Sequence, residues 1–243
     1  FPFVIILLFI HHWLLAAEPV AIISKLRGTV KHKLVSENKY QDNTHLNTSI
    51  LSDSQIQTKK GAFAKIVYLD DGSAISIYAD SELKIQGAIK NRMILKQVNL
   101  IRGIIRVDVI HQTSGEFQLL TPTSEVNCKE CSFWVISDEL NGDKFIKETG
   151  IAKLLNPSVN STMELVSDST IIAKDNIGFE IIKTPITDIK FLESLMLDAD
   201  EKMLQYKKEQ PEDQKTKVIT NIVVIKLKNA ANIEREIILT YTQ

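Results

Sequence analysis

The chain has 243 residues, 44% of them apolar, and its 29 Lys and Arg residues nearly balance its 30 Asp and Glu residues, for a formal net charge of -1. That length suits one large domain, or one domain with a small appendage, and the apolar content is enough to bury a core. Phosphate binding needs clustered positive charge, so the balanced charge excludes nucleic acid as an expected partner. It also excludes a polybasic patch for a membrane surface.

The first 17 residues are apolar apart from His11 and His12, and they end in Ala16-Ala17 before Glu18-Pro19. This length is typical of the apolar region of a secretory signal and is short of the ~20 residues of a membrane span. We expect residues 1–17 to be a signal peptide cut near Ala17, with its basic n-region truncated, and the mature chain to be periplasmic or secreted. Two interpretations stay open: an uncleaved N-terminal anchor, which would be the only membrane contact, and a buried core helix.

From Val20 to about Thr184, apolar and polar residues alternate over short runs that end in Gly, Asp, Asn or Ser. This pattern is typical of half-buried strands joined by turns, and it predicts an all-β fold, a twisted sandwich or β-roll of many short strands. The clearest hairpin is joined by Asp70-Asp71-Gly72-Ser73, where Gly accepts the positive φ that the turn needs. Asp71 and Gly72 are therefore expected to be structural turn residues, as is Gly103 between two further strand patterns.

The composition changes after Thr184-Pro185. Asp188 can cap a helix that begins at Ile189, and Pro211 ends it. Residues 207–217 are charged and predict a linker, and residues 218–241 predict a short terminal hairpin, with a strand followed by a helix as the open alternative. The predicted organisation is thus a signal peptide (1–17), a β domain (18–184) and a C-terminal helix with a short β extension (185–243). The expected apolar face of the helix consists of Ile189, Leu192, Leu195, Met196, Ala199, Met203 and Tyr206.

Several short motifs follow one another in an order that resembles a known family. They are Gly28-Thr29-Val30, Leu69-Asp70-Asp71-Gly72-Ser73, Leu100-x-x-Gly103-x-Ile105-x-Val107 and Phe117-x-Leu119-x-Thr121-Pro122. With these motifs, the stretch from about Ala21 to Thr184 resembles the FecR domain, the extracytoplasmic module of iron-siderophore sigma-factor regulators.

The chain departs from the family pattern in two ways. Lys129-Glu130-Cys131-Ser132-Phe133 stands where the family usually has Arg-Gly-Thr-x-Phe, so we expect a different local backbone there. The family's regulators carry a cytoplasmic helical segment and a membrane span before this domain, whereas here the predicted export signal comes first. The resemblance therefore implies a free-standing, exported member.

Cys128 and Cys131 are the two cysteines of the chain, in the arrangement Cys-Lys-Glu-Cys. In an oxidising compartment two close thiols are expected to form a local disulfide. Residues three apart on a regular strand point to opposite faces, so this disulfide requires a turn within the strand. Unpaired thiols and a redox or metal role remain open, although no second cysteine pair completes a zinc site.

No catalytic, cofactor-binding or metal-binding residues are predicted. His32, His45 and His111 are scattered without metal-ligand spacing, which indicates surface or loop positions. The turn at Asp70 to Ser73 lacks the further ligands of a calcium loop. Nucleophile elbows, phosphate-binding loops and dinucleotide fingerprints are absent from the sequence, so we expect no enzyme and no cofactor.

These observations predict a protein-binding or signal-relay module of the bacterial envelope. Exposed strand edges would dock an envelope protein whose identity the sequence does not give. One alternative is a secreted structural or adhesin-like β module without a signalling role. A second is an exported enzyme whose active site is assembled from scattered carboxylates.

Overall fold

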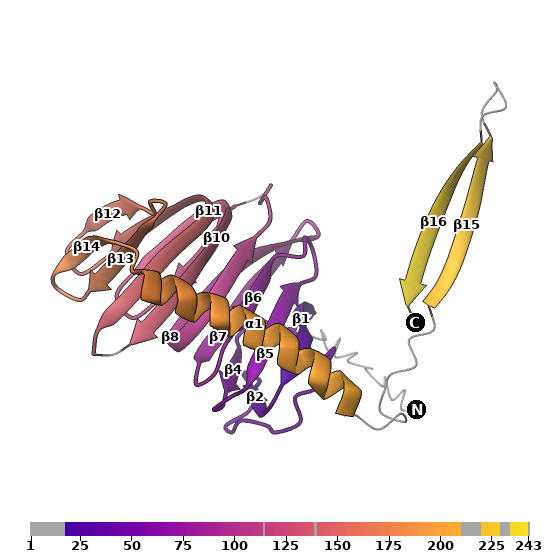
Figure 1. The fold of residues 1–243 in the computed structure, drawn as a ribbon, viewed down its shortest axis with the longest axis horizontal. Helices are drawn as coiled ribbons and strands as arrows, with labels where there is room; N and C mark the ends of the chain where they lie inside the picture. Colours follow the sequence, from indigo (N-terminus) through magenta and orange to yellow (C-terminus); the bar gives the residue numbers. More distant parts are fainter. Residues whose placement is uncertain (1–17, 114, 139, 210–219, 229–233, 243) are drawn as a thin grey trace, which may run out of the picture. The chain divides into compact units, whose positions relative to one another are not determined.

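The computed structural model describes residues 18–113, 115–138, 140–209, 220–228 and 234–242 (Figure 1). The predicted signal peptide, with its cleavage position, lies outside the described residues, as does most of the predicted linker. The described residues up to Met203 form one compact unit and those from Leu204 form a second. Among the residues that are described, no helix has the length and hydropathy needed to cross a membrane.

The first unit is a single 14-stranded sheet with one long helix, so the predicted all-β fold with a C-terminal helix is confirmed. The strands are β1 (Pro19–Arg27), β2 (Val30–Lys33), β3 (Ser49–Leu51), β4 (Ser54–Thr58), β5 (Phe63–Tyr68), β6 (Ala74–Ile77), β7 (Glu82–Lys90), β8 (Met93–Val109), β9 (Phe117–Leu120), β10 (Glu125–Asp138), β11 (Gly142–Asn156), β12 (Ser161–Glu164), β13 (Ser169–Lys174) and β14 (Gly178–Lys183). The predicted hairpin around Asp71 and Gly72 is the antiparallel pair β5–β6.

Three long strands divide the sheet into two halves. β8 pairs with β7 through its first part and with β6 through its second. β10 pairs first with β9 and then with β8, while β11 pairs first with β13 and then with β12. We call the half with β3, β1, β5, β6, β13 and β14 the helix-side half, and the half with β2, β4, β7, β9 and β12 the open half.

The long strands bend where they pass between the halves. The sequence pattern separates the strand before Gly103 from the strand after it, but the structure has one 17-residue strand, β8, that runs through this glycine. Gly103 has φ of 104°, and a Cβ atom there would collide with Ser81, so only glycine fits this bend. In β10 and β11 the matching bend involves register shifts around Cys128 to Phe133 and Gly150.

The inward-facing residues of both halves form one hydrophobic cluster. Ile66, Ile75 and Ile105 of the helix-side half and Ile56 and Val98 of the open half are completely buried in it. Because a single core holds both halves, the folded-over sheet is one structural unit, in agreement with the predicted sandwich.

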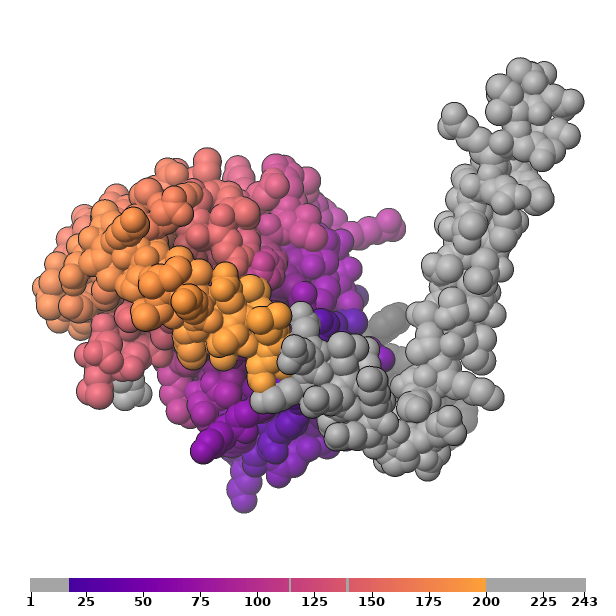
Figure 2. All heavy atoms as spheres, in the orientation of Figure 1, coloured from indigo at the N-terminus to yellow at the C-terminus, as the bar shows by residue number. Residues whose placement is uncertain are grey.

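Helix α1 (Ile186–Glu209) lies across the outer face of the helix-side half, as the ribbon and the space-filling view show (Figures 1 and 2). The predicted helix start at Ile189 was wrong by three residues. Pro185 precedes the first turn, and its carbonyl accepts the N–H groups of Asp188 and Ile189, so Asp188 is already inside the helix. Two ion pairs also link α1 to the strands: Lys144–Asp188 at 4.0 Å and Arg27–Asp198 at 3.1 Å.

The predicted apolar face of α1 meets the sheet in its first half. Leu192 and Ala199 are buried and Leu195 and Met196 are partly buried against the strands. Ile189 is 37% exposed and contributes less than the periodicity suggests. The side chains of Met203 and Tyr206 are outside the described set.

The second unit contains the predicted terminal hairpin. It is an antiparallel pair of β15 (Thr220–Lys228) and β16 (Glu234–Thr242), with Val224 opposite Ile238. The alternative of a strand followed by a helix is therefore wrong.

Candidate functional site

The sheet ends on one side in the border strand β14. This strand pairs only with β13 among the described strands. The N–H of Thr184 donates to the carbonyl of Asp168, so the bonded positions recur every second residue, at Ile182 and Glu180. The main-chain groups of Ile181 and Lys183 therefore point away from β13, toward the free side of the sheet.

Exposed apolar side chains lie on β14 and in the turns at its two ends. Val159 is 40% exposed, Val166 50%, Ile177 75% and Ile181 51%. Ile181 lies opposite the buried Ile171 and continues the inner face of the sheet to its border. Val159 lies beside Gly178, the first residue of β14. We call these four residues the β14 patch. A free ladder next to apolar side chains is the arrangement that accepts an added strand.

The opposite end of the sheet is protected. Its border strands are β3, with three residues, and β2, with four. His32 of β2 also forms a bridge with Gln41 from the loop that follows, and its Nδ1 lies 2.9 Å from Thr44 Oγ1. Short, loop-covered edges of this kind resist strand addition, so the two ends of the sheet are not equivalent.

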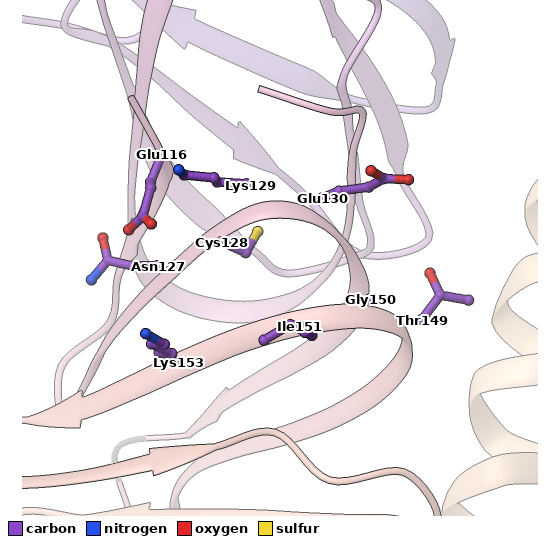
Figure 3. A pocket seen from close by; sticks show the side chains of 9 residues that line it. All are labelled: Glu116, Asn127, Cys128, Lys129, Glu130, Thr149, Gly150, Ile151 and Lys153. Atoms are coloured by element: carbon purple, nitrogen blue, oxygen red, sulfur yellow. The ribbon is translucent and has the colours of Figure 1, made fainter. Parts of the chain in front are cut away.

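A hollow of about 470 Å³ lies where β10 and β11 bend (Figure 3). Glu116 and Asn127 lie next to each other on one side of it, and Ile151, which is 60% exposed, lies on the other. Lys129 and Lys153 also line it. Since both signs of charge are present, the hollow has no single charge preference.

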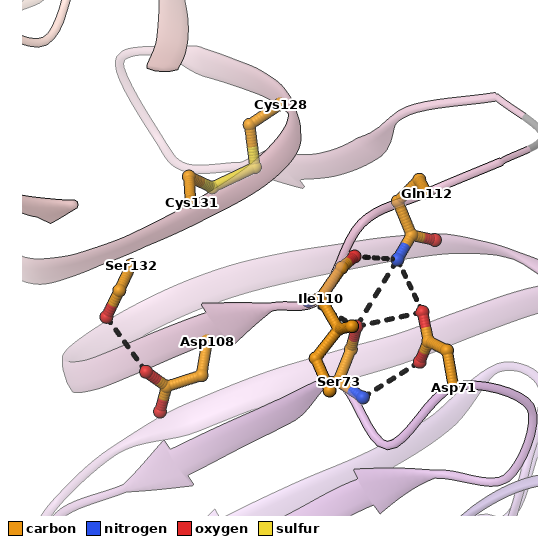
Figure 4. The surroundings of a disulfide bond; sticks show 8 residues. All are labelled: Asp71, Ser73, Asp108, Ile110, Gln112, Cys128, Cys131 and Ser132. Atoms are coloured by element: carbon orange, nitrogen blue, oxygen red, sulfur yellow. Dashed lines mark hydrogen bonds between the residues drawn. A yellow bond between two sulfur atoms is a disulfide. The ribbon is translucent and has the colours of Figure 1, made fainter. Parts of the chain in front are cut away.

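Cys128 and Cys131 form a disulfide in the bend of β10 (Figure 4). Both residues are 3% exposed and belong to the main core. Register shifts between Cys128 and Glu130 and between Ser132 and Phe133 supply the irregular backbone that the pairing requires. This bend falls in the segment that departs from the family pattern. Here the disulfide links two core side chains at the crossing between the halves.

The turn motif Asp70-Asp71-Gly72-Ser73 holds a buried lysine. Lys96 of β8 has a side chain only 1% exposed, and its Nζ lies 2.8 Å from Asp70 Oδ2 and 3.0 Å from Asp71 Oδ2. Gln112 Oε1 accepts a third hydrogen bond from Nζ at 2.9 Å. A buried charge is tolerated only when paired and hydrogen-bonded in this way. The network joins the β5–β6 turn of the helix-side half to β8 in the open half.

The same turn is stabilised internally. Asp71 accepts the backbone N–H of Ser73 at 2.8 Å and also binds the Gln112 side chain (Figure 4). Gly72 has φ of 80°, which the turn needs. Burial raises the pKa of Asp71, but the hydrogen bonds from Ser73, Gln112 and Lys96 outweigh it and lower the pKa overall. Asp71 thus stays ionised opposite Lys96.

The face beneath α1 carries aromatic side chains beside a charged network. Phe63, Tyr78 and Trp134 form a row with ring centroids 5.3 and 5.1 Å apart. Trp134 Nε1 donates to Glu148 at 2.7 Å, and Arg106 pairs with Glu148, also at 2.7 Å. Sequence reasoning missed this network, because partners that lie 42 residues apart in the chain carry no local signal.

The scattered histidines stay apart. His45 and His111 are exposed, but His32 is buried in β2 beside Thr44, so the predicted surface or loop position was wrong for His32. In the part of the chain that the structure describes, no three His, Cys, Asp or Glu side chains are grouped to hold a metal ion. The border strand β14 and the hollow at the bend of β10 and β11 are surface features that could bind a partner or ligand.

An all-β sandwich with one protected end and one open end is the class of module that these features define. Residues 54–144 match the family model described as FecR protein, which confirms the resemblance found in the sequence. The Asp71-Gly72 turn, Lys96, Gly103 and both cysteines lie inside the matched residues.

Two solved structures are also similar. Both are crystal structures described as "a putative anti-sigma factor from Parabacteroides distasonis ATCC 8503", with 22% sequence identity and TM-scores of 0.44 and 0.45. Each match covers 54% of this chain and 58% of that chain, so the chain spans little more than half the length of those proteins. No curated protein matches the chain.

Proposed function

We propose that this chain is a signal-relay module of the bacterial envelope that binds a partner protein by adding an extended partner strand to β14. FecR domains are regulatory modules, which supports the relay role. The open ladder of β14 beside the β14 patch is the observation that carries the binding mode.

Addition of a partner strand to β14 would have two stabilising effects. The outward main-chain groups of Ile181 and Lys183 would gain ladder hydrogen bonds. The half-exposed Ile181 side chain would be covered by the partner. Both effects depend on the partner being extended, which distinguishes this mode from docking of a helix.

The envelope location is supported by the family and by the cysteines. FecR domains are extracytoplasmic in the regulators that carry them. A buried disulfide between Cys128 and Cys131 also fits an oxidising compartment better than the cytosol. Alkylation of intact cells with a thiol reagent tests this: protection of both cysteines until a reductant is added is expected, and free thiols in freshly lysed cells would contradict it.

The binding mode is tested with a photo-crosslinking residue in place of Ile181. The matched control carries the same residue at Val35, which is 77% exposed near the protected end. We expect an adduct with one envelope protein from position 181 only, with the partner-side crosslink in a segment that is extended in the complex. Ile181→Pro removes an outward N–H and should abolish binding of that partner without unfolding the domain, since proline is tolerated on an edge strand.

Equal crosslinking from positions 181 and 35 would contradict the proposal. So would full binding by Ile181→Pro, because a ladder cannot form normally through a proline that lacks the N–H donor.

A further inference from the structure

The outer face of the open half carries a groove that the proposed function does not use. The groove has a volume of about 620 Å³ and is lined by amide side chains from four strands. It shares Glu116 and Asn127 with the hollow at the bend of β10 and β11, so the two adjoin. We call the groove the amide groove. Its size is in the range of ligand sites.

The amides of this groove stand in register. Gln86 of β7 is opposite Gln97 of β8, Gln97 is opposite Gln118 of β9, and Gln118 is opposite Asn127 of β10. One uncharged amide thus comes from each of four neighbouring strands, at steps of about 4.8 Å. On the next strand Lys153 of β11 is opposite Asn127 and lines the hollow.

Carboxylates fix the orientation of three of these amides. Glu125 Oε1 accepts from Gln118 Nε2 at 2.6 Å and from Asn127 Nδ2 at 2.8 Å. Asp53 Oδ1 accepts from Gln86 Nε2 at 2.9 Å. An ionised carboxylate only accepts hydrogen bonds, so the NH2 end of each amide must face it. The carbonyl oxygens of Gln86, Gln118 and Asn127 are therefore left as acceptors.

We propose that the amide groove binds a linear, uncharged glycan of N-acetylated sugars that runs across the strands. Such a chain carries hydroxyl donors on every sugar, at a repeat close to the strand spacing, and acetamido N–H donors that face one side at every second sugar. The three oriented carbonyls and the Gln97 amide would therefore meet donors along its length. The exposed side chains of Leu95 in the groove and Ile151 in the adjoining hollow give apolar surface for sugar rings.

A charged polymer fits the groove less well. The amides carry no net charge, and the charged residues around them have both signs: Asp53, Glu116 and Glu125 are acidic, and Lys129 and Lys153 are basic. An extended protein segment is matched by the free ladder of β14, whereas this groove presents side-chain groups instead of main-chain edges.

Titration of the purified chain with chitohexaose, a soluble chain of N-acetylglucosamine, tests the inference. We expect saturable binding by calorimetry, and cellohexaose, which lacks the acetamido groups, to bind at least about tenfold more weakly. Gln97→Ala and Gln118→Ala should each weaken chitohexaose binding about fivefold, the effect of one lost hydrogen bond.

The matched control is Asn99→Ala. Asn99 lies on β8 two residues beyond Gln97, on the same face, but does not line the groove. The Asn99→Ala variant should bind chitohexaose with the same affinity as the unchanged chain. All three variants should unfold at the same temperature. Absence of saturable binding, equal binding of cellohexaose, or equal loss in Asn99→Ala and Gln97→Ala would each overturn the proposal. Because β14 takes no part, failure here leaves the strand-addition proposal intact.

Discussion

The two outer faces of the sandwich are built by the same long strands and are chemically opposite. Beneath α1, β10 contributes Trp134 to an aromatic row with Tyr78 and Phe63. On the open half, the first part of β10 contributes Asn127 to a row of amides. A strand that crosses between the halves thus changes the chemistry of its outward residues at the bend, while its inward residues stay apolar throughout.

The chemistry of each outer face matches what covers it: α1 covers the aromatic face, and solvent covers the amide face. Large aromatic side chains need an apolar neighbour, which α1 supplies through Leu192 and Ala199. Half-buried amides remain solvated without any cover. Stability should therefore depend strongly on the helix-side face, whereas the open face should tolerate substitution and serve for recognition.

Trp134→Ala should produce the largest loss of stability. Trp134 is 2% exposed under α1, and removing it leaves a cavity and deprives Glu148 of a donor. We expect the free energy of unfolding to fall by about 3–5 kcal/mol in urea denaturation. Gln97→Ala on the open face is the matched control and should change it by less than about 0.5 kcal/mol. Equal losses would mean that the two faces are energetically alike.

Lys96→Met tests the ionic link between the halves. Methionine has a similar length but no charge, so Asp70 and Asp71 would be left facing an apolar group. Removing one partner of a buried ion network should cost about 3 kcal/mol. Lys84→Met is the control, because Lys84 pairs with Asp53 at 2.6 Å on the partly exposed open face. A loss below about 1 kcal/mol for Lys96→Met would show that the buried network contributes little.

Replacement of both cysteines tests the bend that separates the two faces. The disulfide closes a very short loop, with a sequence separation of three, so the loop-entropy effect is about 2 kcal/mol. The double variant Cys128→Ser, Cys131→Ser should lower the free energy of unfolding by about that amount, and the reduced native chain should match it. A much larger loss in the variant than in the reduced chain would attribute the effect to the buried serines instead of the crosslink.

The sequence predicts those features of the molecule that depend on neighbours in the chain. The β5–β6 hairpin follows from Asp71-Gly72, and the contact face of α1 follows from the spacing of Leu192 and Ala199. The burial of Lys96 could have been predicted, because the residue occupies the same inward-facing series, at every second position, as Ile94 and Val98. Period-two burial does not show that a lysine will find ion-pair partners there.

The sequence pattern does not predict the pairing register between strands that are far apart in the chain. The amide row needs the pairing of four strands, and Arg106 meets Glu148 only because β8, β10 and β11 are adjacent. The free edge of β14 is likewise a property of the strand order, since nothing in its own residues says that no strand follows. The sequence predicts that an exposed strand edge would form the binding site, but it does not predict that this edge would be β14.

The smallest expected effect concerns pH and the charged network beside α1. Burial raises the pKa of Glu148, but hydrogen bonds from Arg106, Ser132 and Trp134, with the charge of Arg106, outweigh it and lower the pKa overall. A carboxyl whose pKa is lowered by folding stabilises the folded state above its unfolded pKa of about 4.3, and this contribution is lost as the pH falls through the folded pKa.

Glu148→Gln should therefore reduce stability by about 1 kcal/mol at pH 7, where the native carboxylate is ionised. As the pH falls below about 4.3, the unchanged chain should lose stability faster than the variant, so their difference should shrink. Denaturation curves at pH 7, 4 and 3 measure it, with Glu164→Gln, an exposed residue of the open half, as the control. If the difference stayed constant from pH 7 to 3, the Glu148 charge would not be what stabilises this face, and hydrogen-bond geometry alone would account for the loss.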